Sequence, residues 1–248
     1  MQRTLFGIIA GLTAAAIWGG MYVVSKAVMG VVPPFSLITL RLVLGIIVLA
    51  IVMLLRGMFF SGWRVTRKQF WQVFGVGFVG YGISIGFQFV GTKLSTASNG
   101  SLVTSATPAF VLLFAAIVLR EKITPRRLLA LIVASLGVLA VIDPRTAQLS
   151  SSLFLGNLCL VAAALTWALY SVLVRKVTRN IDVLTVSLIT FAGGLPVSLP
   201  LGAWEAVSQG YGVITPSVIG GILFLGIIAT ALAMYLWNTP LSLHLMRV

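Results

Sequence analysis

The chain alternates between long apolar runs and short polar connections. A helix that crosses a bilayer needs about 20 mostly apolar residues. Eight runs reach or approach this length, and they cover residues 5–29, 34–55, 70–91, 97–119, 126–142, 152–174, 183–203 and 213–237. Because a segment surrounded by lipid must pair its own backbone groups, each run predicts a spanning helix. The pattern therefore predicts an all-α fold, a polytopic membrane helical bundle of eight transmembrane helices.

Composition agrees with a chain that is surrounded by lipid. Hydrophobic residues make up 59% of it and charged residues 8%, with a mean hydropathy of +1.11. A soluble domain carries roughly 25% charged residues, so a soluble domain of this kind would lack the polar surface that water requires. The first apolar run continues to Val32, which is longer than the apolar core of about 7–15 residues in a signal peptide. We therefore expect the first span to be retained in an integral, multi-pass membrane protein.

The formal charge of +13 raises the question of nucleic-acid binding. The cations lie in short clusters between apolar runs, and no soluble stretch exists to form the basic face that such binding uses. In the predicted topology, 13 of the 17 lysines and arginines fall on one side of the membrane. Since cytoplasmic loops are enriched in these residues, we expect both termini to be cytoplasmic and expect no nucleic-acid partner.

Two pairs of segments indicate an internal repeat. The sequence Ser36-Leu37-Ile38-Thr39 recurs at residues 187–190, at an offset of 151. Residues of the first span recur in the sixth at an offset of 149, as Gly7 with Gly156, Ala14 with Ala163, Trp18 with Trp167, and Lys26 with Arg175. Such an offset places five spans in each repeat, so the second copy enters the membrane from the opposite side. Inverted repeats of this kind are common in secondary transporters. The predicted domains are residues 1–148 (spans one to five) and 149–248 (spans six to eight).

The second repeat is expected to be incomplete. Residues 237–242 correspond to residues 90–95, after which the first repeat continues for about 45 residues and the second for six. We interpret this as the absence of the last two helices. The alternatives are a truncated or frameshifted product and a protein that works with eight spans.

Several short motifs resemble the EamA-like ten-helix group of the drug/metabolite transporter superfamily. Trp18-Gly19, Lys26, Pro34 and Arg41 are similar to that group's first two helices, and residues 229–238 to its eighth. Residues 96–108, followed by Leu119-Arg120-Glu121-Lys122, are similar to its fourth helix and the acidic turn after it. The resemblance implies a secondary transporter in a bacterial-type cell (inner) membrane, with no cofactor. It would move a small metabolite, such as an amino acid or a related neutral or anionic solute, by alternating access and in the direction of efflux.

Arg41 is a candidate for solute recognition because it lies about two turns into the second span. Charged residues inside the membrane are costly and are functional hypotheses by default. In one interpretation Arg41 faces a polar cavity and attracts an anionic group such as a carboxylate. In the other, its long side chain extends to the headgroups or caps helix carbonyls.

A polar stripe on the fourth span is the second candidate. Ser98, Ser101, Ser105 and Pro108 are spaced by three, four and three residues, which places them on one helix face. This face either lines a solute path, loosened at the proline, or packs closely against another helix through small residues and hydroxyls. Trp18, Tyr22 and Trp167 are candidates for a semi-polar cavity wall, although aromatic residues also form interfacial belts. The predicted substrate-binding residues are Trp18, Tyr22, Arg41, Ser98, Ser101, Ser105, Pro108 and Trp167.

Other chemistry finds little support in the sequence. The carboxylates Asp143, Asp182 and Glu205 lie at span ends, which argues against a cation antiporter with a carboxylate relay in the membrane. The single histidine, His244, lies in the tail, and no base is available to a serine nucleophile. We therefore expect no enzyme activity, no catalytic residues and no metal site. The predicted partners are the lipid bilayer, a small-molecule solute and a second copy in a homo-oligomer. The alternative to transport is a truncated, non-transporting membrane protein or a packing subunit.

Overall fold

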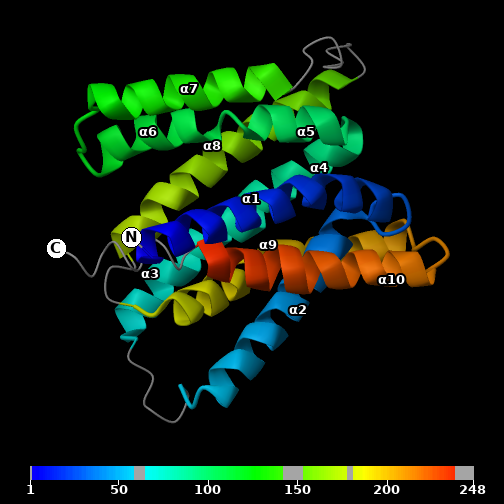
Figure 1. Cartoon of the computed structure of the whole chain (residues 1–248). Helices are drawn as coiled ribbons and strands as arrows, with labels where there is room; N and C mark the ends of the chain where they lie inside the picture. Colours follow the sequence, from blue (N-terminus) through cyan, green and yellow to red (C-terminus); the bar gives the residue numbers. More distant parts are fainter. Residues whose placement is uncertain (1, 59–64, 142–152, 178–180, 238–248) are drawn as a thin grey trace.

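The computed structural model describes residues 2–58, 65–141, 153–177 and 181–237, and every regular element in these ranges is a helix (Figure 1). The helices are α1 (Gln2–Val28), α2 (Pro34–Leu55), α3 (Arg67–Gly77), η1 (Phe78–Ser84), α4 (Ile85–Leu94), α5 (Ala97–Thr104), α6 (Thr107–Val118), α7 (Pro125–Val141), α8 (Phe154–Val177), α9 (Val183–Ser208), α10 (Pro216–Leu223) and η4 (Phe224–Leu232). The expected linker, with the boundary at 148–149, and the tail after Trp237 lie outside the described residues.

The helices follow the apolar runs closely. The third run is one continuous helix, Arg67–Leu94, and the eighth is Pro216–Trp237. By length and composition, six helices in the described ranges can cross a membrane. The remaining two expected spans are α1, with 27 residues, and α7, with 17. The structure thus confirms the prediction of an all-α, polytopic membrane bundle.

Helix starts are fixed by proline and by short polar side chains. Pro34 occupies the first turn of α2, where its missing N–H costs nothing. At the start of α3 the Thr66 hydroxyl accepts from the Gln69 amide at 3.2 Å, while the Gln69 side chain accepts from the Thr66 amide at 3.0 Å. The Asp182 carboxylate accepts from the Leu184 amide at 2.8 Å and so caps α9. These caps satisfy amides that have no partner within their own helix.

The third and eighth spans each contain a π-helical segment, η1 and η4. The two begin 146 residues apart, at Phe78 and Phe224, so they occupy matched positions in the expected repeats. A π-helix widens the turn and is frequent at functional sites. In η4 the Thr230 hydroxyl donates to the Leu225 carbonyl at 2.7 Å, across the widened turn.

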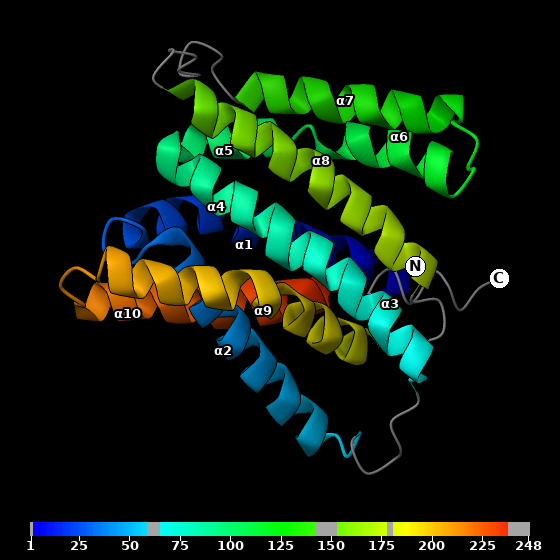
Figure 2. The same ribbon diagram turned by 180° about the vertical axis from the view of Figure 1, so that it is seen from behind.

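The core of the bundle is built around α2 and α9, which pack against each other. η1 packs on α9 and η4 packs on α2; likewise, α8 packs on η1 and α1 packs on η4. In the expected repeats, α1, α2 and η1 correspond to α8, α9 and η4. Each π-helical segment therefore packs on the two corresponding helices of the other repeat. Figures 1 and 2 show α5, α6 and α7 along one side of the bundle and α2 on the opposite side.

The two ends of the bundle differ in charge. Figures 1 and 2 place the beginnings of α1 and α3, the turn between α6 and α7, and the end of α8 at one end. We call this the basic end, because the turn and the helix ends there carry Arg67, Arg127 and Arg175. The end formed by the last turn of α1 and the first turn of α2 is called the opposite end.

Glycines allow α3 and α9 to approach each other at backbone distance. A Cβ atom at Gly77 would lie 2.3 Å from the carbonyl oxygen of Thr190. A Cβ atom at Gly193 would lie 2.3 Å from the carbonyl oxygen of Phe74. Because both obstacles are backbone atoms within helices, neither can move aside without separating the two helices.

We expect Gly77→Ala to lower the stability of the detergent-solubilised protein by about 1–3 kcal/mol, because overpacking forces the backbones apart. Gly75→Ala is the matched control, since a Cβ atom there has nothing within 4 Å. Thermal unfolding of the two variants checks this expectation. Equal midpoints for Gly77→Ala and Gly75→Ala would contradict the close contact of α3 with α9.

Candidate functional site

Arg41 lies in the centre of the bundle and is 3% exposed. Its Nε donates to the Thr230 hydroxyl at 2.9 Å, and its guanidinium carbon lies 5.1 Å from the centre of the Phe89 ring. Among the described residues, Nη1 has no hydrogen-bond partner. A buried arginine normally has its donors paired, so this nitrogen is available to an anionic group. Of the two interpretations drawn from the sequence, this placement fits the inward-facing one.

η4 connects Arg41 with Trp18. Thr230, the acceptor for Arg41, follows Ala229, whose carbonyl oxygen accepts from Trp18 Nε1 at 3.1 Å. Trp18 also lies 5.3 Å from Trp237, measured between ring centroids. Two of the predicted site residues therefore contact neighbouring positions of the same π-helical segment.

Tyr22 belongs to a hydrogen-bonded cluster near Arg41. Its hydroxyl donates to the Thr104 hydroxyl at 2.7 Å and accepts from the Gln88 side-chain amide. This joins α1, α4 and α5. Gln88 precedes Phe89, whose ring lies against the Arg41 guanidinium. The cluster therefore places polar side chains of three helices close to Arg41.

A group of aromatic rings joins η1 to α8 and α9. The Trp167 ring lies 4.7 Å from Tyr170 and 5.7 Å from Tyr81, measured between centroids. Tyr81 also lies 4.7 Å from Phe191 in an edge-to-face arrangement. Trp167 therefore contacts η1, as its repeat counterpart Trp18 contacts η4. Such rings offer favourable contacts to a planar aromatic group.

The serine stripe of the fourth span lies apart from Arg41. Ser98 and Pro108 are exposed, whereas Ser101 and Ser105 are half-buried and donate to carbonyls of their own helix. The face that meets Tyr22 is instead that of Gly100 and Thr104. The structure interrupts the helix between α5 and α6, directly before Pro108. A role of this stripe in solute binding stays a prediction.

Two charged side chains cap helices at the opposite end. Lys26 Nζ donates to the carbonyl oxygens of Thr92, Lys93 and Ser95 at 2.8, 2.7 and 2.6 Å. The Glu205 carboxylate accepts from the Ser36 amide at 2.8 Å. A cation thus lies at the C-terminus of α4 and an anion at the N-terminus of α2, which is the favourable arrangement for both helix dipoles.

These contacts join helices that are distant in sequence. The Ser36 hydroxyl donates to the Gly202 carbonyl at 3.0 Å, and the Gly212 amide donates to the Val31 carbonyl at 2.9 Å. Ser95 donates to the Asn157 side chain at 2.7 Å, which adds α8. At the opposite end, α1, α2, α4, α8 and α9 and the residues next to them are consequently joined by hydrogen bonds.

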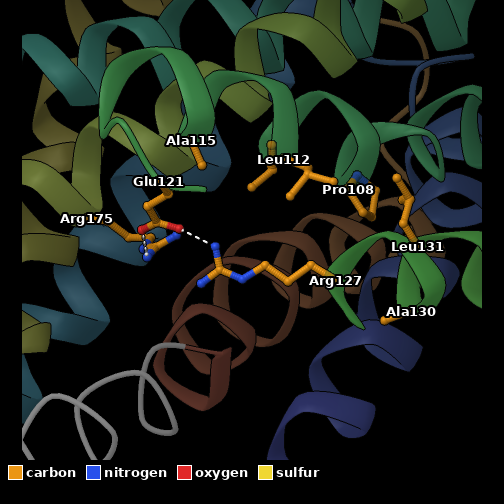
Figure 3. Close-up of a pocket in the computed structure, with 9 residues that line it drawn as sticks. Pro108, Leu112, Ala115, Glu121, Arg127, Ala130, Leu131 and Arg175 are labelled. Atoms are coloured by element: carbon orange, nitrogen blue, oxygen red, sulfur yellow. Dashed lines mark hydrogen bonds and ion pairs between the residues drawn. The ribbon is translucent and has the colours of Figure 1, made fainter. Parts of the chain in front are cut away.

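At the basic end Glu121 bridges two arginines. Its carboxylate accepts from Arg127 at 2.7 Å and from Arg175 at 2.9 Å, and Figure 3 shows it between the two guanidinium groups. Partial burial opposes ionisation of Glu121, but hydrogen bonding to Arg127 and the charges of both arginines hold the pKa of its carboxyl below the ordinary value. The bridge joins the turn after α6 to the end of α8.

Sequence reasoning missed several residues of this arrangement. Thr230 and Phe89 contact Arg41, yet the hydrophobic pattern of their apolar runs does not indicate the contact. Glu205 was placed at a span end, but it is 4% exposed. A signal for Thr230 was available, because it stands within the motif Ala229-Thr230-Ala231 that resembles the family.

The sequence matches the EamA-like transporter family over residues 5–142 and 154–243. The chain belongs to the EamA-like transporter family. This confirms the resemblance to the drug/metabolite transporter superfamily drawn from Trp18, Arg41 and the turn at Glu121. Membership, together with the apolar helices, makes the chain an integral multi-pass membrane protein of a transporter family.

Relatives of this EamA-like chain carry transporter names. The uncharacterized transporter YetK of Bacillus subtilis is 26% identical over 245 residues, which is 98% of this chain and 74% of YetK. The aromatic amino acid exporter YddG of Ancylobacter novellus is 28% identical over 172 residues, 68% of this chain and 58% of that protein. The riboflavin transporter of Brucella anthropi is 34% identical over 139 residues, 55% of this chain and 47% of that one.

A solved crystal structure has the same fold as this EamA-like chain. It superimposes with a TM-score of 0.71 at 23% identity, covering 94% of this chain and 77% of the other. At this identity the likeness shows the arrangement of helices alone.

The Glu121 bridge makes the stability of this EamA-like chain depend on acid pH. Because the folded-state pKa lies below the unfolded value of about 4.3, the stabilising contribution is present above that value and is lost as pH falls through the lowered pKa. We expect Glu121→Gln to have a lower free energy of unfolding than the wild-type protein at neutral pH, by about 0–1 kcal/mol for each exposed pair. The difference should shrink progressively as the pH is lowered below the unfolded value. A difference independent of pH would show that the ionised bridge does not stabilise the fold.

Proposed function

We propose that this chain is a secondary transporter whose solute binds Arg41 through an anionic group. The observation that carries the proposal is the buried Arg41 guanidinium with Nη1 unpaired among the described residues. Burying a charge without a full set of partners costs several kcal/mol. A solute carboxylate would supply the missing acceptor and form a charge-assisted hydrogen bond.

The remainder of the solute is proposed to be aromatic or apolar, as in an aromatic amino acid. Trp18 contacts η4 next to Thr230, Trp167 packs against Tyr81, and Tyr22 and Gln88 form a polar pair, so the proposed site has both rings and polar groups. Two relatives are named for solutes with aromatic rings, aromatic amino acids and riboflavin. The range proposed from the sequence, a small neutral or anionic metabolite, is narrowed by these contacts to one with a carboxylate or similar anion.

Alternating access between inverted repeats is the proposed mechanism. The proposed domains remain residues 1–148 and 149–248, and the family matches two segments that fall on either side of this boundary. The matched π-helical segments and the exchanged helix contacts support the same division. Because Arg41 is 3% exposed, a solute would reach it only after the helices move.

The conformation described is proposed to be the one closed at the opposite end. Lys26 and Glu205 tie α1 to α4 and α9 to α2 there, so opening would require these contacts to break. In the proposed orientation the basic end is cytoplasmic and the opposite end is external. The proposed direction is efflux, supported by the name of the YddG relative, an exporter.

A packing subunit is a second candidate function. In the most apolar part of the helix Ala97–Val118, 6% of the residues are buried, against 33–61% in the five other long apolar helices. The exposed face of α5, α6 and α7 would then be covered by another chain, and a second copy would make a homo-oligomer. Transport by the purified protein alone would remove this alternative.

We expect Arg41→Gln to reduce transport of L-phenylalanine and L-tryptophan into proteoliposomes by about 10- to 100-fold, because a hydrogen bond to a charged group contributes about 1.5–3 kcal/mol. Arg41→Lys should retain part of the activity. Phenylethylamine, which lacks the carboxylate, should not compete.

The matched control for this test is Arg56→Gln. Arg56 is the exposed arginine at the end of the same helix, so its removal should leave transport unchanged. Insertion of all variants is confirmed by gel filtration. Wild-type transport rates in Arg41→Gln would remove Arg41 from the site.

We expect Lys26→Met to open the opposite end, because three carbonyl oxygens of α4 lose their shared donor. The reporter is Thr92→Cys in a Cys159→Ala background, labelled by a membrane-impermeant maleimide, since Thr92 is 1% exposed beneath the cap. Labelling should rise severalfold in Lys26→Met and stay low in Lys93→Met, which removes a neighbouring exposed lysine. Equal labelling in both variants would show that Lys26 does not hold this end closed.

A further inference from the structure

A pocket of about 400 Å³ lies between α6, α7 and the end of α8. Its walls are apolar, formed by residues such as Leu112 and Ala115 from α6 and Leu131 from α7. Figure 3 shows the Glu121 bridge at one end of these walls. None of the lining residues contacts Arg41, so the pocket is separate from the proposed solute site.

At the charged end of the pocket, most of the arginine hydrogen-bond donors are not used by Glu121. One carboxylate, that of Glu121, accepts from both Arg127 and Arg175, so the three groups together carry a net charge of +1. Each guanidinium has five N–H donors and uses one in its bond to Glu121. The side chains of Arg127 and Arg175 are 50% and 45% exposed, so their remaining donors are accessible. Glu121 holds the two arginines in place while leaving donors for an external anion.

The two helices that form most of the pocket, α6 and α7, lie along one side of the described bundle, and their faces away from the pocket are exposed. Ile117 on α6 is 64% exposed, and Leu129 and Val133 on α7 are each 61% exposed. In an integral membrane protein such a flank faces lipid tails. A ligand for this pocket therefore needs an alkyl chain beside the apolar walls and an anionic group at the level of the two arginines.

We propose that this pocket binds one anionic phospholipid, with its phosphate at Arg127 and Arg175 and an acyl chain between α6 and α7. Basic pockets between transmembrane helices bind anionic headgroups in this manner. Arg127 lies in the first turn of α7 and Arg175 in the last turn of α8, and Glu121 bridges the two. The bound lipid consequently fastens the α6–α7 turn to the end of α8, independently of any transported solute.

The test measures lipid retention by native mass spectrometry on the full chain purified in detergent. Phosphatidylglycerol, phosphatidylcholine and inorganic phosphate are added in separate arms. We expect the wild-type protein to retain one phosphatidylglycerol about 10- to 30-fold more strongly than phosphatidylcholine, because each arginine near the headgroup contributes about 1 kcal/mol. The double variant Arg127→Gln/Arg175→Gln should lose this preference.

The matched control is Arg126→Gln/Lys176→Gln. It removes two positive charges from exposed positions next in sequence, neither of which lines the pocket. This control should retain the lipid, and Leu131→Trp, which fills the apolar part, should reduce retention without a change of charge. Arg127→Lys/Arg175→Lys keeps both charges and serves if the glutamine variant fails to fold.

Two outcomes would overturn the proposal. Equal loss of phosphatidylglycerol in both glutamine double variants would indicate a diffuse basic surface. Displacement of the lipid by an equal concentration of inorganic phosphate, with Leu131→Trp behaving as the wild type, would indicate an anion site without a lipid-binding pocket.

Discussion

In a bilayer no water reaches the backbone, so each amide and carbonyl of a spanning segment must be paired within the protein. Regular helix meets this demand by itself, and the irregular points do not. In this chain such points obtain partners from other helices. Lys26 donates to the carbonyls at the end of α4, and Trp18 donates to the Ala229 carbonyl in η4. Glu205 accepts from the Ser36 amide. The places where helices are irregular are therefore also the places where they are joined.

The same constraint applies to the buried side chain of Arg41. A guanidinium that is 3% exposed, with one hydrogen bond from Nε and one ring beneath it, is incompletely paired within the described part of the chain. Its Nε donates to Thr230 in η4, and the neighbouring Ala229 carbonyl accepts from Trp18. A ligand that pairs with Arg41 would thus act on a π-helical segment and, through it, on α1. In the proposed mechanism, this would connect solute binding to the helix movements of alternating access.

Much of the fold was predictable because hydropathy is a local property. The run at 34–55 is the helix Pro34–Leu55, which begins at the two prolines that the sequence displays. The neighbour that each helix face contacts, by contrast, depends on residues that are distant in the sequence. The spacing of the serine stripe predicts one face of the fourth span, but periodicity does not say which face turns inward. Thr104, beside the stripe, makes the contact with Tyr22. Glu205 is buried because α2, 169 residues away in sequence, brings an amide to it.

The central claim is that Arg41 receives the anionic group of a transported solute, and a structure with bound ligand tests it most directly. The protein would be determined by crystallography or electron microscopy in the presence of saturating L-tryptophan. The account predicts the ligand carboxylate within hydrogen-bonding distance of Arg41 Nη1 and the indole among the rings of Trp18, Trp167 and Tyr81. A ligand bound elsewhere, with Arg41 still unpaired at Nη1, would contradict it.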